Sequence, residues 1–291
     1  MLTYEHTDSI TNWNTYQPYF EIDMYYPTDL SNRKKAKRKE EVVMMLAARF
    51  GFVSAIVLTV VFEVQRHKVT EFLNKLVLKN LLIKVKTNRA ADGVLYVPTY
   101  SGAKYAGEIM RHEVFYRSTK NPIEQINQNS VMHDSILQYV LMRGLQNKTS
   151  AGKHSPLWRG FVTEKEFKRL YSSNRIKSVD AVVINVDGSV AAVEMEGSYK
   201  NKVKVENTIL KLASNMLCQH PLFDKVFFVG SSNKVFEDTK RFQTQLLDEL
   251  PHRYNKKTKN TYLTEQEAEL LKDKLVFRTK FTDEINKLFY S

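Results

Sequence analysis

The sequence contains one cysteine, Cys218, among 291 residues. A single cysteine excludes an intrachain disulfide and any zinc site with several cysteine ligands, and it fits a reducing compartment. Long apolar runs are also missing, because the longest, Phe50–Phe62, is too short to span a bilayer. Residues 1–5 have neither the basic nor the apolar segment of a secretion signal. We therefore expect a cytoplasmic protein without a membrane partner.

Several common catalytic motifs are missing as well. The chain has no glycine-rich phosphate loop, no pair of histidines at metal-binding helical spacing and no Gly-x-Ser-x-Gly elbow. The enzyme classes that depend on those motifs are therefore excluded.

The composition is that of a globular protein with a basic surface. Hydrophobic residues make up 43% and charged residues 26% of the chain, whose length is sufficient for two domains. The formal net charge is +12, and both halves of the chain carry an excess of Lys and Arg. Cations that approach phosphates gain affinity by releasing condensed counterions. The charge therefore favours a polyanionic partner, and we expect double-stranded DNA.

Residues 1–32 lack helical or strand periodicity and are predicted to form a flexible arm. They lead into residues 33–39, of which six of seven are Lys or Arg. Either this basic stretch contacts DNA, through Arg33, Lys34 and Lys35, or it forms the solvated first turn of a helix.

Residues 33–118 are predicted to form a winged helix-turn-helix domain. The spacing of apolar residues predicts three helices followed by two strands, at 40–50, 54–61, 67–80, 81–86 and 94–97. In a winged helix the third helix enters the major groove of DNA. Lys68, Lys75 and Lys79 on that helix are therefore candidate DNA contacts, although such a domain can also bind proteins.

The second domain is predicted to span residues 131–291, after a polar linker within 108–130. Its first helix is expected over 133–145. A further helix should start at Thr163, because Thr163 and Glu166 match a capping box.

Three acidic residues stand at the ends of a predicted hairpin in this domain. Two apolar strands flank Asp187-Gly188, a pair that is typical of tight hairpin turns. Glu194 and Glu196 are two residues apart on the second strand and must project from the same face. Antiparallel pairing brings Asp180 beside them. Converging carboxylates repel one another unless a cation offsets their charge, so we predict a Mg²⁺ or Mn²⁺ site.

The order hydrophobic-Asp180, hairpin, Glu194-x-Glu196, nearby Lys200, helix and strand 226–229 resembles the core of the PD-(D/E)XK nucleases, over about residues 131–250. The resemblance implies an α/β fold, α+β overall, in which a restriction-endonuclease-like domain has a central mixed sheet. It also implies that Asp180 and Glu194 bind the metal and that Lys200 orients or deprotonates the attacking water.

Two departures from that pattern concern the site. Val179 occupies the position of the proline in the family motif, and this proline has no chemical role. Glu196 occupies the position of the usual lysine, which makes it a possible third metal ligand and leaves open whether Glu196 or Lys200 fills the lysine's role.

With the winged helix, His133-Asp134 at the head of a helix, and Trp158 with Glu164, the chain looks closest to the MobC-type mobilisation relaxases and the related replication-relaxation proteins. The resemblance implies site-specific nicking during plasmid or mobile-element mobilisation, with accessory mobilisation proteins as partners. It places His133 near the active site, in contact with water or phosphate, although a single histidine at a helix start is more often a structural hydrogen bonder.

Other functions stay open from the sequence. A transposon end-cleaving subunit, with transposition proteins as partners, and a restriction-type nuclease would use the same fold. A DNA-binding regulator with an inactive nuclease domain would have its acids solvated and paired with Lys200, Lys202 and Lys204. The chain has 15 tyrosines, so a tyrosine nucleophile also remains possible, although none stands out by its context.

Overall fold

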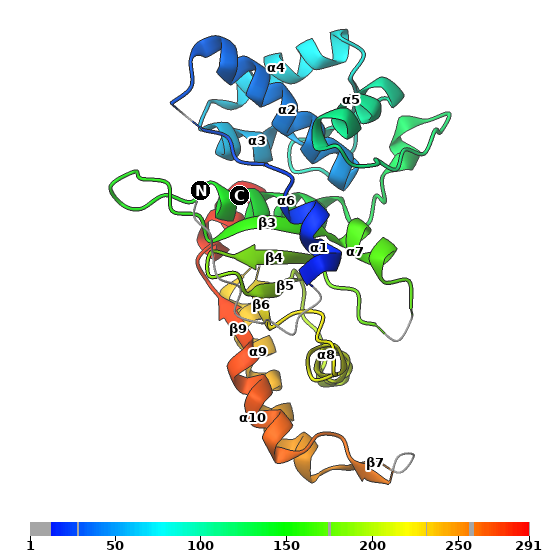
Figure 1. The fold of residues 1–291 in the computed structure, drawn as a ribbon, viewed down its shortest axis with the longest axis vertical. Coiled ribbons are helices and arrows are strands. Elements are labelled where there is room, and N and C mark those ends of the chain that lie inside the picture. The colour runs from blue at the N-terminus through cyan, green and yellow to red at the C-terminus, as the bar shows by residue number, and fades with distance from the viewer. Residues whose placement is uncertain (1–12, 28, 174–175, 231, 256–258, 291) are drawn as a thin grey trace.

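A computed structural model describes residues 13–27, 29–173, 176–230, 232–255 and 259–290. The described residues form a mixed α/β structure in which helices surround a central sheet (Figure 1). No helix in these ranges has both the length and the apolar character that crossing a membrane requires.

The N-terminal half has the predicted order of three helices followed by a hairpin. Its elements are α2 (Asn32–Phe50), α3 (Ala55–Phe62), α4 (Arg66–Leu78), β1 (Leu82–Lys86), β2 (Val94–Pro98) and α5 (Tyr100–Met110). Strands β1 and β2 are antiparallel, and an isolated bridge joins Val53 to Tyr96 of β2. Helix α2 ends at Gly51, whose left-handed φ of 87° places its N–H on the carbonyl of Ala47. The basic stretch 33–39 therefore belongs to the first turns of α2.

The prediction of a flexible arm over residues 1–32 is wrong for residues 13–20, which form helix α1 (Trp13–Phe20). Residues 1–12 lie outside the described residues. Tyr16 and Phe20, four residues apart, share one face of α1 and are buried. The backbone of Phe20 lies so close to Gly160 that a Cβ at residue 160 would be 2.5 Å from the Phe20 carbonyl oxygen. Aromatic burial against the sheet therefore holds this segment.

The C-terminal half contains the mixed sheet that the sequence predicted. Its main elements are α6 (Val131–Leu145), β3 (Trp158–Thr163), α7 (Glu164–Leu170), β4 (Ala181–Asn185), β5 (Val190–Glu196), α8 (Lys202–Met216), β6 (Lys225–Gly230), α9 (Asn233–Glu249), α10 (Glu265–Lys274), β9 (Leu275–Arg278) and α11 (Thr282–Phe289). The strand order is β3-β4-β5-β6-β9. The β3–β4 and β4–β5 pairs are antiparallel, and the β5–β6 and β6–β9 pairs are parallel. The capping box of Thr163 and Glu166 is confirmed.

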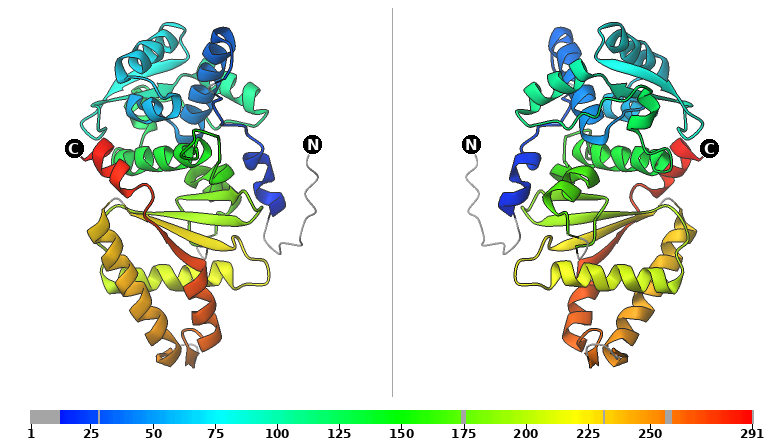
Figure 2. Two further views of the ribbon diagram at one scale, coloured as in Figure 1. Left: turned by 90° about the vertical axis from the view of Figure 1, so that its left-hand side faces the viewer. Right: turned by 90° about the vertical axis from the view of Figure 1, so that its right-hand side faces the viewer.

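The sheet lies between two groups of helices. Helix α6 and the N-terminal helices lie on one side, and α8, α9 and α10 extend from the other (Figure 2). Short elements close the far ends of α9 and α10, namely η2 (Leu250–His252), β7 (Tyr254–Asn255) and β8 (Asn260–Thr261).

One hydrophobic core joins the two halves of the chain. A single cluster of buried apolar side chains runs from α2 and α3 through α6 to β3, β4 and β5. Arg49 of α2 also forms a buried ion pair with Glu166 of α7, with 2.8 Å between Nε and Oε1. The predicted linker 108–130 includes the end of α5 and the turn η1 (Pro122–Gln125).

Candidate functional site

The hairpin of β4 and β5 brings the first two predicted acids together. The register pairs Ala181 with Val193, so the preceding Asp180 lies beside Glu194. Asp180 Oδ2 also accepts a hydrogen bond from the backbone N–H of Met195, at 2.7 Å. The predicted turn is confirmed, because Gly188 has a φ of 87° and Asp187 accepts a bond from the N–H of Ser189.

Glu194 is buried and contacts Lys177, which no sequence pattern indicated. Its Oε1 lies 2.7 Å from Nζ of Lys177. Burial, followed by the negative charge of Asp180, raises the pKa of Glu194 to about 8, although Lys177 acts in the opposite direction. Glu194 therefore retains a proton near neutral pH unless further positive charge approaches it.

Glu196 forms a second ion pair on the same strand. Its Oε1 lies 2.8 Å from Nζ of Lys200. Its other oxygen, Oε2, is buried and has no hydrogen-bond partner among the residues that the structure describes. A buried carboxylate oxygen in this state is costly, and a cation would satisfy it.

His133 lies beside Asp180 in the structure. At the start of α6, its Nε2 lies 3.3 Å from Asp180 Oδ2 and its Nδ1 lies 3.2 Å from Asp134 Oδ1. Burial opposes a charge on the ring, but hydrogen bonds to Asp134 and Asp180 outweigh it and raise the pKa of His133 to about 10. The same contact with His133 lowers the pKa of Asp180 in spite of burial. His133 and Asp180 therefore form an ion pair at neutral pH.

The three acids are not arranged around a single metal position. Within the described ranges, no three His, Cys, Asp or Glu side chains gather in a way that could hold a metal ion. Instead, Lys177 lies against Glu194 and Lys200 lies against Glu196. Two ammonium groups thus lie at the carboxyl groups where a divalent cation was expected.

The predicted DNA contacts lie on α2 and α4. Arg33, Lys34, Lys68 and Lys75 are exposed, and Lys35 is partly buried. Lys79, in contrast, is held by Glu40 of α2 at 2.5 Å. Burial, followed by the positive charges of Lys35 and Lys68, lowers the pKa of Lys39, so cations of both helices share one surface. In the sequence, Lys39 is only one of six cations in residues 33–39, and nothing there distinguishes it from the others.

Glu194 predicts a pH-dependent stability. Folding raises its pKa from 4.5 to about 8, so the folded protein holds a proton that the unfolded chain releases in this range. The free energy of unfolding must then fall as the pH rises from 4.5 to 8. Glu194→Gln removes this titration. Its Tm in EDTA, followed by circular dichroism, should fall less between about pH 5 and about pH 9 than the Tm of the wild type.

The exposed Glu269→Gln is the matched control, because it removes a carboxyl group that lies on α10, away from the acidic hairpin. Equal losses of Tm in Glu194→Gln and Glu269→Gln would contradict the assignment.

Comparisons with known proteins give no relative from which a function could be transferred. No protein-family model, no curated protein and no solved structure matches this chain. Its function must therefore be inferred from its own residues: a buried pair of acids, their two lysines and a charged histidine.

Proposed function

We propose that this chain is a metal-dependent DNA endonuclease with the site chemistry of the PD-(D/E)XK nucleases. The observation that carries the proposal is the position of Asp180 beside Glu194, on paired strands of a mixed sheet and largely out of water. Carboxylates with strongly shifted pKa values cluster at functional sites, because their repulsion is costly in a purely structural role.

The donor atoms suit a hard divalent cation. Asp180, Glu194 and Glu196 would hold Mg²⁺ or Mn²⁺ once Glu194 and Glu196 turned from Lys177 and Lys200, because both ions prefer carboxylate oxygens and Glu196 Oε2 lacks another partner among the described residues. When bound, such an ion supplies Lewis-acid polarisation of a phosphate and of water.

The remaining residues of the site have roles that follow from their contacts. Lys177 and Lys200 place ammonium groups at the acids, where they can stabilise negative charge that develops on a phosphate. His133 is a cation bound to Asp180, so it fixes the orientation of that carboxylate and can donate to a phosphate oxygen or a water.

The finer proposal is site-specific nicking in plasmid or mobile-element mobilisation, with accessory mobilisation proteins as partners. It is supported by the resemblance of this chain to MobC-type relaxases. One feature of that resemblance is that His133 precedes the acidic hairpin. Transposon end cleavage and restriction-type cleavage use the same chemistry and differ in the number of strands cut.

The test is incubation of the full chain with supercoiled plasmid in Mg²⁺, in Mn²⁺ and in EDTA. Metal-dependent open circles, nicked on one strand at one position, support the nickase. Metal-dependent linear DNA supports the transposon-type or restriction-type enzyme instead. Tight binding without cleavage in either metal contradicts the endonuclease. It supports the second candidate, a DNA-binding regulator with an inactive nuclease domain, which the two lysine–glutamate contacts favour.

For DNA binding, we propose that residues 33–118 act as a winged helix and that α4 contacts phosphates. Replacing Lys68, Lys75 and Lys79 with Ala should weaken binding on every sequence, and each lost phosphate contact should reduce the salt slope by about one. We expect Lys79 to contribute least, because Glu40 already pairs with it. Fluorescence anisotropy at several salt concentrations measures both quantities. Lys234→Ala on α9 is the control, and unchanged affinity and slope in the triple variant would exclude α4 as the DNA-binding helix.

A further inference from the structure

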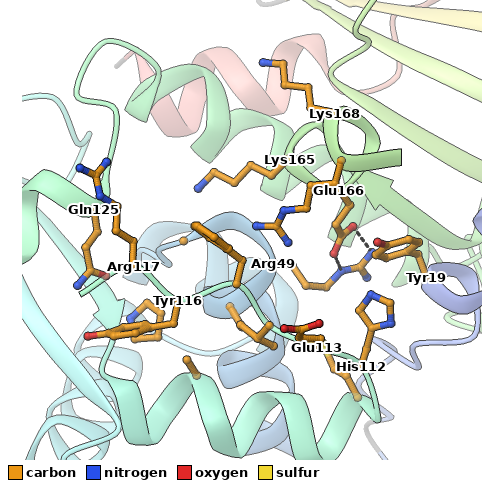
Figure 3. Close-up of a pocket in the computed structure, with 18 of the residues that line it drawn as sticks. Tyr19, Arg49, His112, Glu113, Tyr116, Arg117, Gln125, Lys165, Glu166 and Lys168 are labelled. Carbon is orange, nitrogen blue, oxygen red and sulfur yellow. Dashed lines mark hydrogen bonds and ion pairs between the residues drawn. The ribbon is translucent and has the colours of Figure 1, made fainter. Parts of the chain in front are cut away.

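A cavity of about 400 Å³ lies between α2, α5 and α7, apart from the acidic hairpin. Its walls come from the end of α2, from α5, from the segment 111–125 and from α7. Figure 3 shows Lys165 extending into this space from α7, and Arg49 joined to Glu166 beside Tyr19. Its volume is within the range of small-molecule sites.

Cations predominate in the wall. Five basic side chains face three carboxylates: Arg49, Arg117, Lys165, Lys168 and Arg169 against Glu113, Glu124 and Glu166. Glu166 is already occupied, because it pairs with Arg49 and caps α7 through the N–H of Thr163. Lys168 is likewise paired, with Glu164. Arg117, Lys165 and Arg169 still outnumber Glu113 and Glu124, so the wall carries a surplus of positive charge.

Arg49 is the buried member of this group. Its side chain is 1% exposed, and its Nε and Nη2 bind Glu166 and the carbonyl of Phe161. Its Nη1 is buried without a hydrogen-bond partner among the residues that the structure describes. A guanidinium nitrogen without a partner still has N–H groups that can donate hydrogen bonds, so an anion beside Arg49 would be stabilised.

Three further cations, Lys165, Arg117 and Arg169, have N–H groups that can still bind an anion. Lys165 donates one hydrogen bond to the carbonyl of Phe50, at 2.5 Å. Burial of its ammonium group, with Arg169 nearby, lowers the pKa of Lys165, although Asp134 acts in the opposite direction. Arg117 and Arg169 form no ion pair with a described residue. An anion in the cavity would offset this repulsion.

Aromatic rings line the same cavity. Phe115 is 68% exposed, and the guanidinium of Arg169 lies 4.8 Å from the centre of its ring. Tyr116, Tyr19 and His112 also contribute to the wall. Exposed rings beside arginines are the combination on which nucleic-acid bases stack while their phosphates bind the cations.

We propose that this cavity binds a nucleoside phosphate, with its phosphate on the Arg49, Arg117, Lys165 and Arg169 group and its base against Phe115 or Tyr116. Two sources share this chemistry: a nucleotide unit of a single DNA strand and a free nucleotide. A single DNA strand is the occupant that we expect if the proposed endonuclease function holds. The cavity and the acidic site are neighbours through Asp134, which acts electrostatically on Lys165 and also pairs with His133. Binding itself does not depend on cleavage.

The test measures binding to the full chain in EDTA, by fluorescence anisotropy. The probes are a fluorescent deoxyadenosine phosphate and a labelled ten-residue oligothymidine, with inorganic phosphate as competitor. The variant Arg117→Ala/Arg169→Ala removes two exposed cations of the wall, and Lys165→Met removes a third while keeping its apolar stem. The matched control Lys211→Ala/Lys234→Ala removes two exposed cations from α8 and α9.

We expect the affinity for at least one probe to fall about tenfold or more in the cavity variants. In the control variant the affinity should fall less than about twofold. Loss for the oligonucleotide alone identifies a DNA strand, and loss for both probes identifies a site that also accepts free nucleotides. Equal losses in the cavity and control variants, or competition by inorganic phosphate as effective as by the nucleotide, would overturn the proposal. Because EDTA prevents metal-dependent cleavage, failure of the endonuclease assay leaves this result unaffected.

Discussion

Asp180→Asn is expected to reduce DNA cleavage by about a thousandfold or more while leaving DNA binding nearly intact. The substitution removes the charge of a proposed metal ligand but keeps the size of a side chain that lies between His133 and the N–H of Met195. In EDTA the Tm should stay close to that of the wild type, because an amide oxygen at residue 180 still accepts the N–H of Met195 and the lost ion pair with His133 is partly exposed to solvent. With Mg²⁺ or Mn²⁺ the wild type should gain more stability than the variant.

Plasmid nicking, anisotropy and thermal melting measure these three effects. Asp273→Asn, an exposed acid on α10, is the control and should retain full activity. If Asp180→Asn nicks at the wild-type rate in a preparation free of contaminating nuclease, the acidic hairpin is not the active centre, and a tyrosine nucleophile becomes the better hypothesis.

The same assay separates the two lysines. Lys177→Met should lose more activity than Lys200→Met, because Lys177 contacts Glu194 directly beside Asp180. The opposite order would assign the role to Lys200, as the resemblance implies. Glu196→Gln should lose activity only if Glu196 is a third metal ligand.

Arg49→Met is expected to destabilise the protein by about 3–5 kcal/mol, because it leaves the buried carboxylate of Glu166 without its counter-charge. The side chains of Arg49 and Glu166 are 1% and 8% exposed. Glu166 also accepts the N–H of Thr163 in the capping box of α7, so it cannot move into water without losing that cap. Urea denaturation gives the free energy of unfolding directly.

Two further variants show whether the burial of the pair is responsible. Arg49→Met/Glu166→Gln should recover part of the loss, because no unpaired buried charge remains. Arg241→Met, which breaks the exposed pair with Asp238, should cost less than about 1 kcal/mol. A loss in Arg49→Met no larger than that in Arg241→Met would show that the pair does not stabilise the contact between α2 and α7.

The local features of the fold were predictable from the sequence. Asp187-Gly188 is a turn whose geometry depends on its own residues, and the hairpin then places Asp180 beside Glu194 by strand pairing alone. The capping box at Thr163 is similarly local. Helix order in the N-terminal half followed from apolar periodicity.

Features that depend on distant partners were not predictable in the same way. Helix α1 is short. It is held by ring contacts of Tyr16 with Phe167 and Tyr171 and by the close approach of the Phe20 backbone to Gly160 of β3, all more than a hundred residues away in the chain. Lys177 precedes β4 in a segment without periodicity, and Asn215 of α8 holds its carbonyl. The cations of the cavity come from three separate segments, so no spacing rule gathers them.

The continuous core between the two halves limits how the chain can be taken apart. In many multidomain proteins a recognition domain can be exchanged as a cassette, because few contacts cross the linker. Here α3 packs on α6, and Arg49 has its counter-charge on α7. A cut within 108–130 would expose apolar surface on both fragments and leave Glu166 without its partner, and exposed patches of this kind promote aggregation. A fusion that transfers the N-terminal half to another protein would therefore also have to include the contacting surfaces of α6 and α7.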